Sequence, residues 1–277
     1  MNVADIGKST VDGPSETGKG TVYLVGAGPG DADLLTVRAQ RLIQEADVLV
    51  YDRLVSEEIL DLSPQDTARV FVGKSPSRHT LPQEEINRLL VRLAGSGRDV
   101  VRLKGGDPFI FGRGGEEAEE LARAGIPFEV VPGITAASGC LAALRVPLTH
   151  RGVATGARFV TGHCREGVAL DLNWDSLADP DTTLVIYMGL SNITVMTEQL
   201  MAAGLQPDTP ALAVSAGTTP RQQTCRSTLG GLPEDVVSDG LSAPVLIVIG
   251  RVVEAAEVAG ISQVLVERAV KEAVPGA

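Results

Sequence analysis

The sequence predicts an α/β fold of two domains with mostly parallel sheets, and three observations support this. Short apolar segments of strand length alternate along the chain with segments whose apolar residues recur at helical spacing. Glycine-rich loops join several of these strands to the helices that follow them. The chain has 277 residues, of which 44% are hydrophobic, so it can fill a sizeable core.

Strand–helix–strand units account for the first half of the chain. In the clearest helix, Ile86, Leu89, Leu90 and Leu93 recur at i, i+3, i+4 and i+7, so they share one face. Repeated units of this kind favour a parallel sheet. The strands expected here are residues 21–25, 48–51, 99–103 and 128–131, and the expected helices are residues 33–45, 84–93, 114–124 and 135–144.

The second half continues the alternation, with prolines at many of its connections. The strands expected there are residues 158–161, 183–188, 211–215 and 245–249, with an added strand at 224–228. The expected organisation is a disordered leader over residues 1–20, an N-terminal α/β domain over 21–132, a C-terminal α/β domain over 136–255 and a helical tail over 256–277.

Charge and composition limit the classes of partner. The net charge of -11 and the aromatic content of 3% argue against nucleic acid. Residues 38–113 nevertheless hold 12 Lys and Arg against 11 Asp and Glu, a net charge of +1, which is consistent either with an anionic substrate or with a mixed solvated surface. Because no run is apolar enough for a signal peptide or a membrane span, we expect no membrane partner.

The cysteines and histidines give no metal-site pattern. Cys140, Cys164 and Cys225 are widely spaced, so neither a disulfide framework nor a zinc site is indicated, and a cytoplasmic location fits best. The three histidines also lack ligand spacing. We therefore expect no metal.

The most informative segment runs from Val101 to Glu117, where an apolar strand leads through a glycine-rich loop into a helix. Gly105 and Gly106 would let a ligand approach the backbone, and Asp107 offers one acceptor. An aspartate would repel phosphate, so this loop suits a neutral or cationic ligand with hydroxyls. The alternative is a glycine-rich turn capped by the aspartate.

Five loops are expected at the carboxyl ends of strands, where ligands bind in α/β folds. The first of them invites a dinucleotide interpretation, but Asp31 stands where that fingerprint needs glycine or alanine. An NAD-linked oxidoreductase is therefore disfavoured. We expect the loops to meet at one cleft, and they span residues 26–31, 105–110, 132–136, 188–189 and 216–218.

Charged residues follow two of the apolar strands. Asp52 and Lys74 could work as base and acid in one cleft, or could be a surface ion pair. Cationic side chains nearby could bind carboxylates by charge-assisted hydrogen bonds. These are Arg53, Lys74, Arg78, Arg102, Lys104 and Arg113.

Six motifs lie between about Thr21 and Val252: GAGPGD (26–31), YDRLV (51–55), VRLKGGDPFIFGRGGEE (101–117), VVPGITAAS (130–138), PLTHR (147–151) and YMGL (187–190). Together they resemble the tetrapyrrole methylase family of class III methyltransferases, and within it the uroporphyrinogen-III C-methyltransferases. The resemblance implies a homodimer of two-domain subunits that binds S-adenosyl-L-methionine in the cleft between the domains and releases S-adenosyl-L-homocysteine.

The resemblance also assigns residues to roles. By motif position, Asp52 is the proton acceptor and Lys74 the proton donor. Among the cations named above, Arg53, Arg78 and Arg113 are our candidates for binding the substrate. The cofactor-binding positions are Pro29, Gly105, Gly106, Asp107, Ile110, Thr135, Ala136, Met188 and Gly217.

The reaction implied is methylation of uroporphyrinogen III at C-2 and C-7 to give precorrin-2, for sirohaem or cobalamin synthesis. No segment resembles the dehydrogenase and chelatase module of fused sirohaem synthases, so precorrin-2 is the expected product. Two alternatives remain open. One is a sister corrin-pathway methyltransferase acting on another ring carbon, and the other is a non-catalytic module that binds S-adenosylmethionine or tetrapyrrole.

Overall fold

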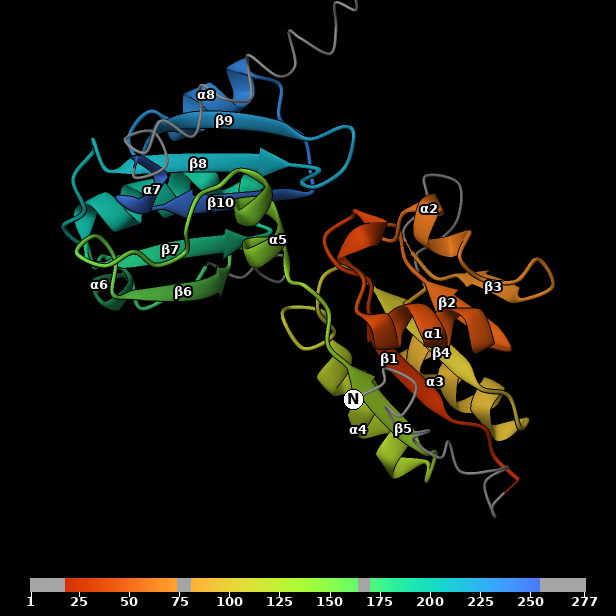
Figure 1. Ribbon diagram of the computed structural model, residues 1–277. Coiled ribbons are helices and arrows are strands. Elements are labelled where there is room, and N and C mark those ends of the chain that lie inside the picture. Colours follow the sequence, from red (N-terminus) through yellow and green to blue (C-terminus); the bar gives the residue numbers. More distant parts are fainter. Residues whose placement is uncertain (1–17, 74–80, 164–169, 255–277) are drawn as a thin grey trace, which may run out of the picture. The chain divides into compact units, whose positions relative to one another are not determined.

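The computed structural model describes residues 18–73, 81–163 and 170–254, which form two compact units (Figure 1). The first unit contains residues 18–27 and 35–133, and the second contains residues 28–34 together with the described residues from 134 onward. Residues 28–34 thus belong to the second unit, whereas the sequence analysis assigned them to the first domain. Most of the expected leader and all of the expected helical tail lie outside the described residues.

The first unit is built on a parallel sheet in the order β3-β2-β4-β1-β5. The strands β2 and β5 have the bounds that the sequence predicts, and β1 and β4 are shifted by one residue. The bounds are β1 (Val22–Gly26), β2 (Val48–Tyr51), β3 (Ala68–Phe71), β4 (Val100–Lys104), β5 (Phe128–Val131), α1 (Val37–Glu45), α2 (Glu57–Leu60), α3 (Gln83–Gly95) and α4 (Gly114–Arg123).

The helices α3 and α4 cover one face of this sheet. Ile86 and Leu90 of α3 and Leu121 of α4 share a buried cluster with Leu24 and Val100 of the strands. Because side chains alternate along a strand, Arg102 and Lys104 lie on the same face as Val100. The carboxyl-terminal half of β4 therefore presents two cations beneath these helices.

The expected helix over 33–45 is divided in the structure. A short 3-10 helix, η2 (Ala32–Leu34), precedes α1, which begins at Val37. Thr36 causes the break because its backbone is extended and its side-chain oxygen accepts a hydrogen bond from the Ala39 amide at 3.1 Å, as a helix N-cap does.

The second unit has a mixed sheet in the order β6-β7-β10-β8-β9. The pair β6 and β7 is parallel, whereas β10 is antiparallel to both of its neighbours and β9 is antiparallel to β8. The bounds are β6 (Gly156–Thr161), β7 (Thr182–Tyr187), β8 (Pro210–Ser215), β9 (Gln223–Thr228), β10 (Val245–Ile249), α5 (Ala136–Ala143), α6 (Trp174–Leu177), η3 (Leu190–Asn192), α7 (Ile193–Ala202) and α8 (Leu232–Ser238).

The α/β class with mostly parallel pairing is confirmed, and the antiparallel pairs among the named strands lie in the second sheet. Insertion of β10 between β7 and β8 leaves those two strands running in the same direction. Their carboxyl ends therefore lie at the same edge of the sheet.

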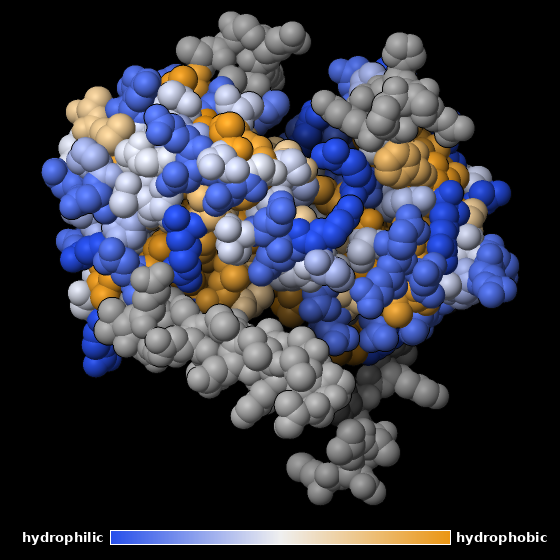
Figure 2. Space-filling model, turned by 90° about the horizontal axis from the view of Figure 1, so that it is seen from above, coloured by the Kyte–Doolittle hydropathy of each residue, from blue (hydrophilic) through white to orange (hydrophobic). Residues whose placement is uncertain are grey.

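The visible surface mixes hydrophilic residues with separate hydrophobic ones (Figure 2). In the first unit, the exposed large apolar side chains include Leu54, Phe109 and Phe111, which follow β2 and β4 at their carboxyl ends. Within the described part of the chain, no helix is long and apolar enough to cross a membrane.

Candidate functional site

The first sheet has a topological switch point between β1 and β4. The chain leaves β1 toward β2 on one side and leaves β4 toward β5 on the other. In open α/β sheets, ligands bind in the crevice beyond the carboxyl ends of strands at such a point. The loops after β1 and β4 are the ones that carry the GAGPGD and GGDPFIFGR sequences.

Two glycines, Gly26 and Gly133, allow the loops after β1, β4 and β5 to pack backbone against backbone. A Cβ atom on Gly133 would lie 2.2 Å from the Gly106 carbonyl oxygen, and one on Gly26 would lie 2.5 Å from the Gly133 nitrogen. No other residue fits without displacing main chain. These close contacts fix the loops that the sequence analysis expected to line a ligand site.

Asp107 uses both of its carboxylate oxygens within the protein. Its Oδ1 accepts a hydrogen bond from the Phe109 amide at 2.8 Å, and its Oδ2 accepts one from the Gly133 amide at 3.0 Å. The first bond closes the loop after β4, and the second joins that loop to the end of β5. Asp107 therefore shapes the site, whatever it contributes to a ligand.

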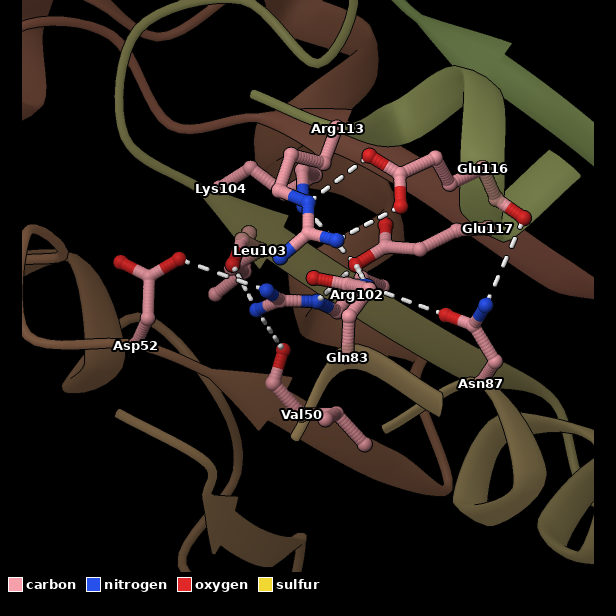
Figure 3. Close-up of polar contacts among 10 residues, drawn as sticks. All are labelled: Val50, Asp52, Gln83, Asn87, Arg102, Leu103, Lys104, Arg113, Glu116 and Glu117. Carbon is pink, nitrogen blue, oxygen red and sulfur yellow. Dashed lines mark hydrogen bonds and ion pairs between the residues drawn. The ribbon is translucent and has the colours of Figure 1, made fainter. Parts of the chain in front are cut away.

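Four charged residues form what we call the buried charge cluster: Asp52, Arg102, Lys104 and Glu117 (Figure 3). Arg102 and Lys104 are each 3% exposed, and Glu117 is fully buried. Arg102 Nε and Lys104 Nζ both donate to Glu117 Oε1, at 3.2 and 2.9 Å. The prediction that Arg102 and Lys104 could bind substrate carboxylates is therefore wrong, because both cations are already paired inside the protein.

Burial is also the main electrostatic influence on Lys104. It lowers the pKa of the ammonium group below its ordinary value, and the positive charge of Arg102 acts in the same direction. The carboxylate of Glu117 opposes both effects. The charged form of Lys104 is thus disfavoured by burial and by Arg102 and favoured by Glu117.

Asp52 lies at the outer end of this cluster, just beyond β2. Its side chain is 26% exposed. Oδ1 accepts a hydrogen bond from the Leu54 amide at 3.0 Å, while Oδ2 lies 3.4 Å from an Arg102 NH2 atom. Both carboxylate oxygens thus have a partner within the protein, and the side chain remains partly exposed.

The predicted partners of Asp52 are placed only in part. Lys74 and Arg78 lie outside the described residues. Arg53 is exposed beside Asp52, in the turn after β2. Arg113 is also exposed, but its guanidinium binds the carboxylate of Glu116 through two hydrogen bonds of 2.8 and 2.6 Å, which raises the pKa of Arg113. A substrate carboxylate would have to replace Glu116 there.

The second unit gathers its predicted cofactor residues at one edge of its sheet. Met188 follows β7, and Gly217 follows β8, which runs in the same direction. Tyr187 connects β7 to the start of α5, because its hydroxyl lies 2.5 Å from Thr135 Oγ1 and accepts a hydrogen bond from the Ala137 amide at 3.0 Å. Thr135 and Ala136 are thereby held at the same edge.

The loop of residues 28–34 completes this edge within the second unit. The ring of Pro29 lies against α5, since a Cβ atom on Gly139 would come within 2.5 Å of the ring. The Asp31 amide donates a hydrogen bond to the Thr218 hydroxyl at 3.2 Å. Pro29, Thr135, Ala136, Met188 and Gly217 are therefore associated in one unit, and Gly105, Gly106, Asp107 and Ile110 in the other.

Backbone strain is concentrated in these loops. Met188, Ala216 and Thr218 have φ angles of 54°, 47° and 61°, and in the first unit Phe111 and Arg113 have φ angles of 51° and 59°. Non-glycine residues in the left-handed region cost about 1–3 kcal/mol each and cluster at functional sites. The strain marks the loops after β4, β7 and β8 as candidates for ligand binding.

The sequence analysis did not predict the roles of Glu117 and Tyr187. One signal for Glu117 was available, because two cations at alternate positions of a buried strand need an anion nearby. No comparable signal marked Tyr187. No group of three or more His, Cys, Asp or Glu side chains that could hold a metal is found among the residues that the structure describes.

Comparisons with known proteins agree on one family. Residues 21–233 match the model of the tetrapyrrole (corrin/porphyrin) methylases. The chain is 59% identical over 235 residues to a siroheme synthase of Nitrosospira multiformis and 58% identical over 234 residues to one of Azotobacter vinelandii. These alignments cover 85% and 84% of this chain but only 50% of each synthase, so the chain spans about half the length of these relatives.

Solved structures of similar length also match. A uroporphyrin-III C-methyltransferase of Thermus thermophilus, in a crystal structure complexed with S-adenosylhomocysteine, is 43% identical, with a TM-score of 0.73 and coverage of 85% of this chain and 94% of that one. A cobalt-precorrin-4 methyltransferase is 27% identical, with a TM-score of 0.75 and coverage of 84% and 95%.

Proposed function

We propose that this chain, which belongs to the tetrapyrrole (corrin/porphyrin) methylase family, methylates uroporphyrinogen III at C-2 and C-7 with S-adenosylmethionine and yields precorrin-2. The observation that carries the proposal is the 43% identity to a uroporphyrin-III C-methyltransferase, 94% of whose chain is covered. The 27% identity to the cobalt-precorrin-4 methyltransferase gives less support to the sister reaction. The activities of the remaining half of the siroheme synthases are not part of the proposal.

The loops fit S-adenosylmethionine as the cofactor. Gly105 and Gly106 present main chain at the switch point, and the Thr135 hydroxyl and the strained backbone at Met188 offer polar groups in the second unit. Backbone amides and carbonyls suit a ligand that carries hydroxyls, an amine and a carboxylate. When bound, the cofactor supplies an electrophilic methyl group on a sulfonium centre.

The protein's part in this reaction is positioning and proton handling. A reduced pyrrole carbon is already nucleophilic, so no activated side-chain nucleophile is needed, and alignment can supply about 7–11 kcal/mol of barrier lowering. The partly exposed Asp52 carboxylate, held by the Leu54 amide and Arg102, suits the acceptance of a proton from the methylated ring. We assign the complementary donor role to Lys74.

We assign substrate binding to Arg53, Arg78 and Arg113. Uroporphyrinogen carries carboxylates around an apolar ring, and Arg53 and Arg113 are exposed near apolar side chains such as Leu54 and Phe111. Arg113 would exchange its contact with Glu116 for a substrate carboxylate, which keeps the guanidinium paired throughout.

We also propose a homodimer in the cytoplasm. Free buried thiols fit a reducing compartment, and burial raises the pKa of Cys140 to about 11 and that of Cys225 to about 12, so both stay protonated. The dimer rests on the family resemblance. Light scattering on the purified chain tests it, and a monomer mass would contradict it.

Product mass tests the proposed reaction. The purified protein is incubated anaerobically with uroporphyrinogen III and S-adenosylmethionine, and the tetrapyrrole products are analysed by mass spectrometry. Two added methyl groups support the proposal. Unchanged uroporphyrinogen III with intact cofactor binding would instead favour a sister methyltransferase or a non-catalytic binding module.

A further inference from the structure

The buried charge cluster runs as a chain of alternating charge from the site into the protein interior (Figure 3). Asp52 forms the exposed end, Arg102 follows, and Glu117 is the fully buried end that Lys104 shares. The residues come from three elements, since Asp52 follows β2, the two cations lie on β4, and Glu117 lies in the first turn of α4.

Every side of the Arg102 guanidinium has a partner. Its Nε donates to Glu117 Oε1 at 3.2 Å, and NH1 donates to the Leu103 carbonyl at 2.8 Å. NH2 lies 3.4 Å from Asp52 Oδ2. Glu117 holds the Nε side of the planar guanidinium, which helps to direct NH2 at Asp52.

Glu117 also offsets the repulsion between two buried cations. Arg102 and Lys104 lie on the same face of β4, and both donate to the one Oε1 atom. Without this negative charge, Arg102 and Lys104 would repel each other in a buried place and the guanidinium would turn away. From α3, the Gln83 side-chain amide donates to the same oxygen at 3.1 Å and to Asn87 at 3.0 Å, which fixes the carboxylate in turn.

Stability alone gives little reason for such a cluster. Buried ion pairs are often replaced by apolar residues with no loss of stability, and apolar side chains such as Leu90 and Val100 already fill the rest of this face. We propose that Glu117 is a positioning residue of the methyl-transfer site: its buried carboxylate fixes Arg102, and Arg102 orients Asp52. This inference rests on the proposed function.

Glu117→Gln is the main test variant, because it keeps the shape of the side chain and removes the charge. The matched control is Glu120→Gln, on the same helix, where Glu120 pairs with Arg123 at the surface. For Glu117→Gln we expect kcat to fall by about 10- to 100-fold, as for other residues that orient a reacting group. The KM for uroporphyrinogen III and the Kd for S-adenosylmethionine should stay within about threefold, and the control should match the wild type.

A double-mutant cycle with Asp52→Asn separates positioning from general damage. If Glu117 acts through Asp52, Glu117→Gln should have little further effect on kcat in the Asp52→Asn background, whereas independent damage would multiply the two losses. Multiplied losses, or a folded Glu117→Gln variant with wild-type kcat, would overturn the proposal. So would loss of cofactor binding in parallel with kcat.

Thermal unfolding of each variant shows whether it is folded at the assay temperature. If Glu117→Gln is not folded, Glu117→Asp replaces it, because it keeps the charge but withdraws the carboxylate by one methylene. A lowered kcat with unchanged cofactor affinity then supports the proposal, and wild-type kcat overturns it. Failure of the proposed function would appear differently, as a wild-type protein that does not methylate uroporphyrinogen III.

Discussion

Replacement of Asp107 by alanine tests how the first unit forms its part of the proposed cofactor site. The substitution removes the acceptors of two main-chain hydrogen bonds, from Phe109 at 2.8 Å and from Gly133 at 3.0 Å. The loop after β4 then loses its connection to the end of β5. We expect both a less stable first unit and a loop that no longer presents Gly105 and Gly106 to the cofactor.

The size of the effect follows from the two bonds. A hydrogen bond to a charged group contributes about 1.5–3 kcal/mol, and water can partly replace the more exposed bond to Phe109. We therefore expect Asp107→Ala to lower the free energy of unfolding by about 2–3 kcal/mol, which lowers Tm by roughly 9–13 °C in a unit of this size. Asp107→Asn keeps one acceptor oxygen and should lower the free energy of unfolding by about half as much.

Calorimetric titration with S-adenosylmethionine measures the functional consequence. Distortion of the loop should weaken binding by at least about 100-fold, equivalent to about 2.7 kcal/mol. Asp66→Ala, at an exposed position of the same unit, is the control and should leave Tm and affinity unchanged. If Asp107→Ala kept the wild-type Tm and affinity, the role assigned to its two hydrogen bonds would be wrong.

Three further predictions concern other parts of the site. In Gly217→Ala the new Cβ atom would lie 2.3 Å from the sulfur of Cys140. We therefore expect the free energy of unfolding, measured by chemical denaturation, to fall by about 1–3 kcal/mol. Cys140→Ala should recover most of that loss in the double variant, and no recovery would place the strain elsewhere. Asp52→Asn should lower kcat by about 10²- to 10⁴-fold in single-turnover assays while the Kd for S-adenosylmethionine stays unchanged, and full activity would remove Asp52 from the mechanism. Glu117→Gln should destabilise the protein by about 3–5 kcal/mol near neutral pH, because it leaves buried cations without their anion. This deficit should shrink as pH rises toward 10.5, the ordinary pKa of lysine. The pKa of Lys104 is lowered in the folded state, so in that pH range the unfolded chain binds more protons and stability rises with pH. The rise should be larger in the variant, because Glu117 no longer opposes the lowering of the Lys104 pKa. Denaturation at pH 7 and at about pH 9.5 measures the change, and a deficit independent of pH would contradict this account of Lys104.

Apolar patterning was sufficient to predict most of the strands. The bounds of β2 and β10 agree with the expected ranges because each is a continuous apolar run that ends at a polar or glycine residue. Those of β5 also agree, although Glu129 interrupts its apolar residues, because Pro132 and Gly133 follow it. The start of α1 was placed too early, although Thr36, a good N-cap residue, stood at the observed boundary. Local sequence therefore identified the elements better than their first residues.

Pairing between distant segments could not be predicted in the same way. Nothing in the apolar run of β10 shows that it is inserted antiparallel between β7 and β8, because a fully buried strand has the same pattern in either direction. The bond from Gly133 to Asp107 likewise joins residues whose proximity depends on the order of strands.

The site was predicted best where the main chain itself needs particular residues. Glycines at 26 and 133 are required by close contacts between loops, and their motifs marked those loops in the sequence. Arg102 and Lys104 were interpreted as substrate ligands because a cation near a strand end can face either solvent or the interior. Only the position of Glu117 decides between the two.

The positions of the transferred methyl groups test the central claim most directly. The purified protein is incubated anaerobically with uroporphyrinogen III and S-adenosylmethionine labelled with ¹³C in the transferred methyl group, and the product is examined by NMR. The account predicts two labelled methyl groups, one at C-2 and one at C-7. A label at any other ring carbon, or an unlabelled tetrapyrrole, would contradict it.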